Sequence, residues 1–247
     1  MPVRIYCAVV LTQLTVTFDA ADPARLALFW ADMLSRVTRA DTDGVLIPGT
    51  DTQVGLRFVA GASGKPVPNR LHLHLTSTDQ ADQQRMVTTA LGLGASHLDV
   101  GQRPEEGHLV LADPEGNAFC VIEPGNNYLA GCGLLGEVAC EGTREVGLFW
   151  SAAMGWPLVW DQHGETAIQS PRGGTKVAWG GQPTRPEQGP SRQRFELTAA
   201  DGDQQAEVDR LVALGATPLQ ADSDGVTALA DPDGWPFSVM SSHSRSA

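Results

Sequence analysis

Two histidines in the first half of the chain are the side chains best placed for acid–base chemistry. His72 and His74 are separated by one leucine within the alternating segment 71–75, which predicts a β-strand with both imidazoles on one face. A neutral imidazole can act as a general acid or base near neutral pH, so His72 is our candidate catalytic residue. Two imidazoles that face one cavity would each lower the pKa of the other. The alternative is that His72 is a structural histidine hydrogen-bonded to a neighbour.

Three short motifs occur twice in the same order, which indicates a tandem duplication. Leu-Phe-Trp, Leu-Gly-Ala and Leu-Ala-Asp-Pro begin at residues 28, 93 and 111 and return about 120 residues later. A repeat of this length is too long for a solenoid and has the size of a small domain. We therefore expect one module at 1–123, a Gly- and Asn-rich linker at 124–133, a second module at 134–241 and a tail at 242–247.

The elements that position these residues follow one pattern in each half. The segment 13–18 alternates as a strand, and Asp22-Pro23 begins a helix whose apolar stripe includes Phe29 and Trp30. Strand–helix alternation with short antiparallel returns predicts the α+β class. Gly- and Pro-rich loops are expected at 60–69 and 180–190. The other expected strands are 44–47, 53–59, 71–76, 97–100, 108–112, 118–122, 134–140, 158–160, 166–169, 175–179, 194–198 and 237–240, and the other expected helices are 79–93, 143–154 and 203–214.

The composition excludes several classes of function. A net charge of −12 argues against a nucleic-acid partner, which would need clustered Lys and Arg, and we attribute the charge to solubility. The four cysteines have no Cys-x-x-Cys spacing, which argues against a zinc site and fits free thiols in a reducing cytoplasm. We recognise no signal peptide and no membrane span, so we expect a cytoplasmic protein without a membrane partner.

The paired motifs resemble the vicinal oxygen chelate superfamily, which includes glyoxalase I, the bleomycin-resistance proteins and the extradiol dioxygenases. Three features carry the resemblance: the helix begun by Asp22-Pro23, the helix that ends at Leu93-Gly94-Ala95, and the turn Asp113-Pro114-Glu115-Gly116 before a final strand. The second half departs where Thr143 stands in place of Asp-Pro. The resemblance implies an α+β fold of two tandem glyoxalase-like modules, whose four βαβββ units form open cup-shaped mixed sheets.

The resemblance also implies where a metal ion would be bound. Metal-using members place His, Gln or Glu at set strand positions that face into the cup. These positions carry over to Thr15, Arg57, His72, Cys120, Leu135, Lys176, Arg194 and Ser238. Cations repel a metal ion, and a catalytic metal needs about three protein ligands, so we expect no metal site and no cofactor. A shift of two residues would instead bring in Gln13, His74, Glu137 or Glu196.

Several of these side chains have two possible roles. Arg57 and Lys176 occupy equivalent places in the two halves and could hold an anion or a carbonyl group in each cup, or they could form ion pairs on a strand face. Cys120 is expected to be a small buried residue, because no base is evident beside it.

Tryptophan is concentrated in the second half of the chain. Trp156, Trp160 and Trp179 have no Trp counterpart in the first half. On a concave sheet they could stack on a planar ligand, and the alternative is that they pack in the core.

The sequence therefore predicts a metal-free small-molecule-binding protein of the glyoxalase and bleomycin-resistance type, with an organic ligand such as an aromatic natural product held in a cup. The candidate ligand-binding residues are Thr15, Arg57, His74, Cys120, Glu137, Trp156, Trp160, Lys176, Trp179 and Arg194. The alternative is a metal-independent isomerase, cyclase or lyase with His72 as catalytic residue, and a metal-dependent lyase or dioxygenase is a third possibility. The choice between binder and enzyme stays open, as do the identity of the ligand, the module whose cup is used, and the choice between monomer and homodimer.

Overall fold

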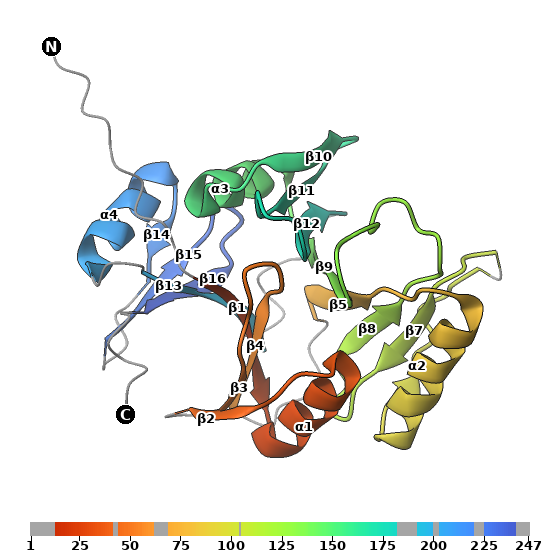
Figure 1. Cartoon of the computed structure of the whole chain (residues 1–247). Helices are drawn as coiled ribbons and strands as arrows, with labels where there is room; N and C mark the ends of the chain where they lie inside the picture. Colours follow the sequence, from red (N-terminus) through yellow and green to blue (C-terminus); the bar gives the residue numbers. More distant parts are fainter. Residues whose placement is uncertain are drawn as a thin grey trace, which may run out of the picture.

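Four βαβββ units follow one another along the chain (Figure 1). The computed structural model describes residues 13–41, 44–61, 69–103, 105–181, 192–199, 203–219 and 225–240. The loops expected at 60–69 and 180–190 lie largely outside the described residues, and the expected tail lies wholly outside them. The first two units comprise β1 (Gln13–Ala20), α1 (Pro23–Leu34), β2 (Arg39–Asp41), β3 (Gly44–Ile47), β4 (Gly55–Ala60), β5 (Leu71–Leu75), α2 (Gln80–Gly92), β6 (Ser96–His97), β7 (Leu109–Ala112) and β8 (Ala118–Val121). The other two comprise β9 (Leu135–Glu141), α3 (Arg144–Met154), β10 (Leu158–Gln162), β11 (Glu165–Gln169), β12 (Lys176–Gly180), β13 (Gln193–Thr198), α4 (Gln204–Leu214), β14 (Thr217–Pro218), β15 (Val226–Ala230) and β16 (Pro236–Met240).

Each of the four helices in the described ranges begins at a side-chain N-cap. Asp22, Asp79 and Asp203 each accept a hydrogen bond from the backbone N–H three residues on, which satisfies a donor that the helix leaves free. Thr143 caps α3 in the same way, and its own N–H and hydroxyl both donate to Asp233 at 2.7 Å. The departure from Asp-Pro at this position therefore leaves the helix start intact.

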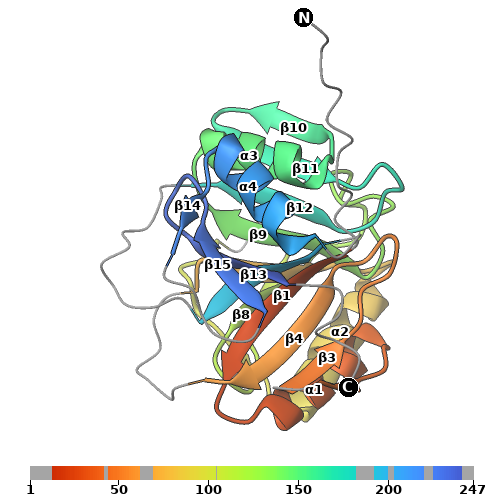
Figure 2. The same cartoon turned by 90° about the vertical axis from the view of Figure 1, so that its left-hand side faces the viewer.

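The strands form two eight-stranded mixed sheets, and each sheet takes one unit from each half of the chain. The first sheet has the order β14-β15-β16-β13-β1-β4-β3-β2, and the second has the order β10-β11-β12-β9-β5-β8-β7-β6. Antiparallel pairing of β1 with β13 and of β5 with β9 joins the halves. The α+β class is confirmed. The idea that each half has its own cup is wrong, because the concave face of each sheet is shared by both halves (Figure 2).

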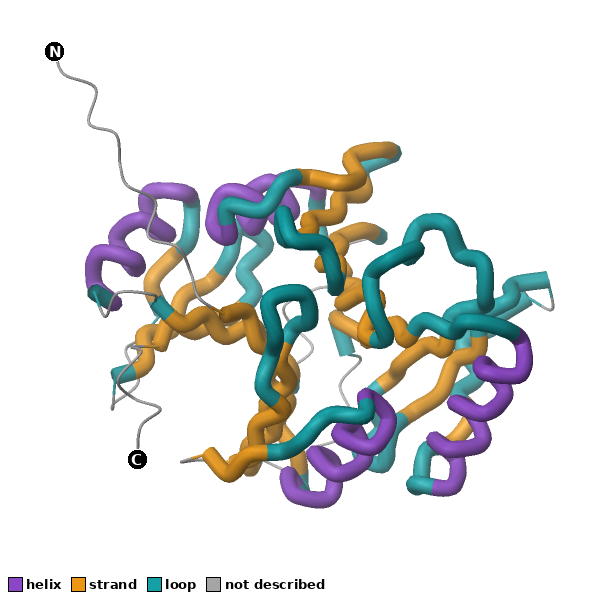
Figure 3. Tube along the Cα trace, in the orientation of Figure 1, coloured by secondary structure: helices purple, strands orange, loops and turns teal. Residues whose placement is uncertain are grey.

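The helices pair within the halves and cover opposite ends of the molecule. Helices α1 and α2 lie together at one end, and α3 and α4 lie together at the other (Figure 3). No helix in the described part of the chain has the length and apolar character needed to span a membrane.

The duplicated motifs contact each other, which explains why they recur together. Trp30 of α1 donates its indole N–H to the turn carboxylate of Asp113 at 3.0 Å, and Trp150 of α3 donates to Asp231 at 3.3 Å. Asp113 also accepts from the backbone N–H groups of Glu115 and Asn117, so one carboxylate shapes the turn and ties it to a helix. Each bond joins the two βαβββ units of one half.

One large apolar cluster extends through both halves, and a second, small cluster lies on the cup side of the second sheet. The small cluster packs Leu129 and Cys132, from the segment between β8 and β9, against Val110, Cys120 and Ile122. The expected linker 124–133 therefore covers part of the second sheet (Figure 1).

Candidate functional site

A row of polar side chains crosses the four central strands of the second sheet. Strand register aligns Cys120 of β8 with His74 of β5, His74 with Glu137 of β9, and Glu137 with Lys176 of β12. The alternation of β5 points Leu71, Leu73 and Leu75 into the core, so His72 and His74 lie on the opposite, cup-facing side. We call Cys120, His74, Glu137 and Lys176 the polar row.

The polar row is held by short hydrogen bonds. Nδ1 of His74 lies 2.7 Å from a Glu137 oxygen, and the other Glu137 oxygen accepts from the Tyr128 hydroxyl at 2.7 Å. Lys176 donates to the backbone carbonyl of Tyr128, and its ammonium lies 3.9 Å from the centre of the Tyr128 ring. The rings of His72 and His74 are 4.7 Å apart between centroids.

The two histidines have opposite protonation preferences. Burial and, after it, the charge of the neighbouring His74 lower the pKa of His72 to about 4. Burial also opposes charge on His74, but hydrogen bonds to Cys120 and Glu137 outweigh it and raise the pKa to about 9. The expectation that each histidine lowers the other's pKa is confirmed for His72 and wrong for His74. At neutral pH His72 is neutral and His74 is an imidazolium that faces the Glu137 carboxylate.

The first sheet carries a different polar arrangement. Arg57 of β4 donates to Glu196 of β13 at 3.1 Å, and its Nε lies 2.9 Å from Asp41 of β2. Thr15 is aligned with Glu196, and the hydroxyl of Thr15 has no hydrogen-bond partner among the described residues. Arg57, Glu196 and Thr15 are all buried. These residues form a buried ion-pair network on the face of the sheet. An ion pair was one of the two roles predicted for Arg57.

The register places different residues in line from those carried over from the superfamily pattern. The strand pairing aligns His74, Glu137 and Glu196. The positions carried over from the superfamily had been His72, Leu135 and Arg194. Arg194 instead forms an ion pair with Asp19 at 2.7 Å. The difference is two residues in each strand, which is the shift that keeps every side chain on the same face.

The aligned residues match the superfamily's metal-ligand set in part, because His74, Glu137 and Glu196 are ligand types whereas Lys176 is a cation. In the first sheet, Arg57 is aligned with Thr17, two residues from Thr15, and its side chain reaches Glu196 from there. The nitrogens of His72 and His74 and the sulfur of Cys120 lie within 4.8 Å of one another. His74 also lies 2.7 Å from Glu137, so an ion bound by His74 would compete with that contact.

The predicted tryptophans are distributed over three different environments. Trp160 packs edge-on against Tyr128 with ring centroids 5.8 Å apart, above the polar row. Trp179 stacks on Trp150 at 6.3 Å and is 3% exposed, which places it in the core. Trp156 lines a separate cavity.

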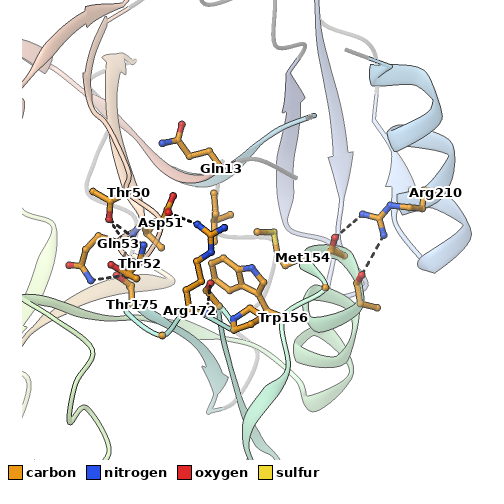
Figure 4. Close-up of a pocket in the computed structure, with 18 residues that line it drawn as sticks. Gln13, Thr50, Asp51, Thr52, Gln53, Met154, Trp156, Arg172, Thr175 and Arg210 are labelled. Carbon is orange, nitrogen blue, oxygen red and sulfur yellow. Dashed lines mark hydrogen bonds and ion pairs between the residues drawn. The ribbon is translucent and has the colours of Figure 1, made fainter. Parts of the chain in front are cut away.

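That cavity lies at the junction of the two halves and has a volume of about 550 Å³ (Figure 4). Its walls come from the start of β1, the loop 50–54, the end of α3 and the turn 170–173. Trp156 and Met154 supply apolar surface, and an ion pair between Arg172 and Asp51 crosses from one half to the other.

Sequence reasoning missed Tyr128, Asp41 and most of the cavity. Tyr128 lies in a segment whose composition indicates only a linker, and nothing in that composition signals that it packs over Glu137. Asp41 is a single carboxylate on a short strand. These residues acquire their partners only through long-range pairing.

Comparison with known proteins agrees with this fold. The family described as "Glyoxalase-like domain" matches residues 15–122 and again 137–240. No curated protein sequence matches the chain. Glyoxalase I from Zea mays is 14% identical and superposes with a TM-score of 0.66 over 94% of this chain and 92% of that one. A putative dioxygenase from Bacillus subtilis subsp. subtilis str. 168 is 13% identical, with a TM-score of 0.60 over 95% of this chain and 86% of that one.

The chain therefore belongs to the glyoxalase-like family and contains its domain twice. Its fold is that of the vicinal oxygen chelate proteins, as the resemblance of the sequence implied. At these identities the similar structures establish the fold alone.

Proposed function

We propose that the protein binds a small organic molecule without a metal ion, and that the ligand is a flat, largely apolar molecule with a negatively charged group. The observation that carries the proposal is the cavity of about 550 Å³ between the two halves. Cavities of this size enclose drug-sized ligands. The ligand lies in this junction rather than in a cup.

The lining of the cavity supports this chemistry. Trp156, Met154 and Val54 offer apolar surface on which an aromatic ring can stack. Arg172 offers a planar guanidinium that pairs well with a carboxylate. Its present partner, Asp51, is 77% exposed, and exposed ion pairs contribute little, so a ligand anion can replace Asp51 at small cost.

The two cups are less suited to a ligand of this size. Leu129 and Cys132 pack against the second sheet beside Cys120. On the first sheet, the ion pair of Arg57 and Glu196 is itself buried. A ligand in either cup would have to displace these groups first.

The binding test compares two substitutions at Ala152, an exposed residue of α3 that lines the cavity. Benzoate, 2-naphthoate and anthraquinone-2-carboxylate are titrated by calorimetry, with their neutral amides as matched ligands. We expect the larger carboxylates to bind, Ala152→Trp to weaken them at least tenfold by filling the cavity, and Ala152→Ser to retain them. The ligand is recovered unchanged. The proposal fails if no carboxylate binds with a Kd below about 1 mM, or if Ala152→Trp binds as the native protein does.

A second candidate function has one observation in its favour. His72 and His74 are adjacent but have pKa values pushed apart, to about 4 and about 9, which is the arrangement of a base beside an acid. This pair would support a metal-independent isomerase, cyclase or lyase reaction at the second sheet. Turnover of a candidate substrate that is lost in His72→Ala and resists chelators would favour this function over simple binding.

A further inference from the structure

We propose that a second, smaller pocket binds a small neutral aromatic molecule that carries a hydrogen-bond donor, such as an indole or a phenol. The walls of this pocket come from β5, β9 and β12 of the second sheet, from β13 of the first sheet, from α3 and from the segment 231–236. We call it the Trp235 pocket. It shares no lining residue with the cavity between the halves, and the proposal does not depend on the ligand of that cavity.

The duplication gives the walls of the Trp235 pocket counterparts in the first half. Strands β1 and β9 have the same place in their sheets, between a parallel partner from their own half and an antiparallel partner from the other half. The registers of these strands make Thr15 the counterpart of Glu137. Phe18 and Cys140 each lie three residues further on, so Cys140 has the place that Phe18 has in the first half.

A phenyl ring that fills the first half is missing from the second. Phe18 stacks on Phe58 with ring centroids 5.4 Å apart, and both side chains are fully buried. In the second half, Cys140 is paired with Trp179, which stacks on Trp150 instead. Cys140 is partly exposed and lines the pocket. Because protein interiors are closely packed, a thiol in the place of a ring leaves space beside it.

The mouth of the pocket also differs from its counterpart. Trp235 has the position in the repeated turn that Asn117 has in the first half. Asn117 accepts a hydrogen bond from Asn69 at 3.0 Å, so two amides join there. In the second half, the guanidinium of Arg70 lies over the Trp235 ring, with its central carbon 2.7 Å from the ring centre. Arg70 is only partly buried, so its long side chain can turn toward solvent and open the pocket.

The lining favours a flat ligand without a net charge. Trp179, Phe195 and Leu71 offer aromatic and apolar surface against which a ring can pack. Arg70 and Glu141 bring opposite charges to the same pocket. A ligand with a charge of either sign would therefore meet one group that repels it.

One buried oxygen supplies a polar contact. Oε2 of Glu141 is buried and accepts no hydrogen bond from any of the described residues. A buried acceptor without a donor has lost the hydrogen bonds that water would give it, and a hydrogen bond to a carboxylate is among the stronger ones. A ligand that brings an N–H or O–H group into the pocket satisfies Glu141, whereas a plain hydrocarbon ring does not.

The size of the pocket restricts the ligand to one ring or two fused rings. Its volume is about 40 Å³, against about 550 Å³ for the cavity between the halves. One water molecule needs roughly 10–15 Å³ of such space, so the closed pocket has room for about three water molecules. A ring therefore enters only when Arg70 moves away from Trp235, and its binding should perturb the Trp235 ring directly.

The test uses the full chain and follows its six tryptophan side chains. Indole and phenol are titrated, with 1-methylindole and anisole as matched ligands that lack the donor. Nitrogen-15 NMR spectra record the side-chain N–H signals, which single Trp-to-Phe variants assign. We expect indole to bind with a Kd below about 5 mM and to shift the signal of Trp235, whereas the signal of Trp156 in the other cavity stays in place. 1-Methylindole should bind about fivefold more weakly or worse.

Substitutions at two lining residues locate the site. Cys140→Phe gives β9 the residue that β1 has, and by filling the pocket it should weaken indole about tenfold or more, whereas Cys140→Ala should leave the pocket open and retain binding. Glu141→Leu should weaken indole about fivefold or more and leave 1-methylindole unchanged. Circular dichroism confirms that the variants are folded, and Cys140→Leu replaces Cys140→Phe if the larger ring prevents folding.

The proposal is overturned if indole gives no saturable shift of the Trp235 signal up to about 5 mM, or if the folded filling variant at Cys140 binds indole as the native protein does. Indole that binds no better than 1-methylindole also overturns it, because Glu141 would then have no part in binding. Loss of indole binding in Ala152→Trp overturns it as well, because indole would then occupy the cavity between the halves. None of these titrations uses a carboxylate, so the proposed function is tested separately.

Discussion

Replacing Glu137 by Gln should lower the pKa of His74 from its value of about 9. In the native protein, Nδ1 of His74 lies 2.7 Å from Glu137, and the two side chains are 18% and 6% exposed. Burial favours the neutral ring, and the contacts with Cys120 and Glu137 raise the pKa to about 9 in spite of it. A rise from the ordinary 6.5 to about 9 corresponds to about 3 kcal/mol in favour of the imidazolium.

A glutamine at this position keeps the shape of Glu137 but loses its charge. Without the negative charge, less opposes the effect of burial, which favours the neutral ring. His74 should therefore titrate near or below pH 7. The assay is a histidine NMR titration of protein labelled at the ring carbons. The chain has six histidines, and His74→Gln identifies the resonance of interest. Glu141→Gln is the matched control at the other end of β9 and should leave the pKa of His74 near 9.

The reasoning is refuted if His74 titrates below pH 7 in the native protein. It is also refuted if the resonance still titrates near 9 in Glu137→Gln, because the charge would then have another source. His72 gives an internal check in the same spectra. It should stay neutral down to about pH 4 and should rise in pKa when His74 is replaced by Gln, since His74 is one of the causes of its lowered value.

Three further predictions test the acid stability, the junction and the duplicated motif. The pKa of His72 is lower in the folded than in the unfolded protein, so its contribution to stability is complete above pH 6.5 and is lost as pH falls toward 4. This loss amounts to roughly 2–3 kcal/mol. In His72→Gln, the free energy of unfolding measured in urea should therefore fall less over this pH range. Gly174 has a φ of +93° and a Cβ there would collide with the backbone of the other half, so Gly174→Ala should lower the free energy of unfolding by more than about 2 kcal/mol, whereas Gly173→Ala (φ +83°), which has open space, should cost less. Trp30→Phe removes the indole donor to Asp113 and should cost about 2 kcal/mol in the same denaturation assay.

The sequence was sufficient to predict the units but not their pairing. The motifs that begin at Leu28 and Leu111 are local, and the structure shows that they bind each other through Trp30 and Asp113. The pairing of strands between the halves cannot be predicted in the same way. Alternation of side chains defines the two faces of β1, but it does not define which strand lies beside β1. The partner of β1 in the other half is β13, which begins 180 residues later at Gln193.

The register explains why the polar row was not fully identified from the sequence. Side chains in a strand alternate with a period of two, so an error of two residues preserves the face and leaves the hydrophobic pattern unchanged. His72 and His74 are therefore indistinguishable by pattern, and only the pairing of His74 with Cys120 and Glu137 separates their roles. The same reasoning applies to Arg194 and Glu196 in the first sheet.

The two sheets show how one side chain decides what a polar row can do. In the first sheet, the guanidinium of Arg57 contacts Glu196 directly and balances the charge of its carboxylate. The two side chains form a buried ion pair. In the second sheet, Lys176 donates to the backbone carbonyl of Tyr128 instead, and the Glu137 carboxylate remains to hold a histidine proton. If a cation paired with Glu137, the carboxylate would no longer offset the burial of His74. The pKa of His74 would then fall, and its ring would be neutral. The position of the Lys176 ammonium over the Tyr128 ring is therefore the contact on which the chemistry of the second sheet depends.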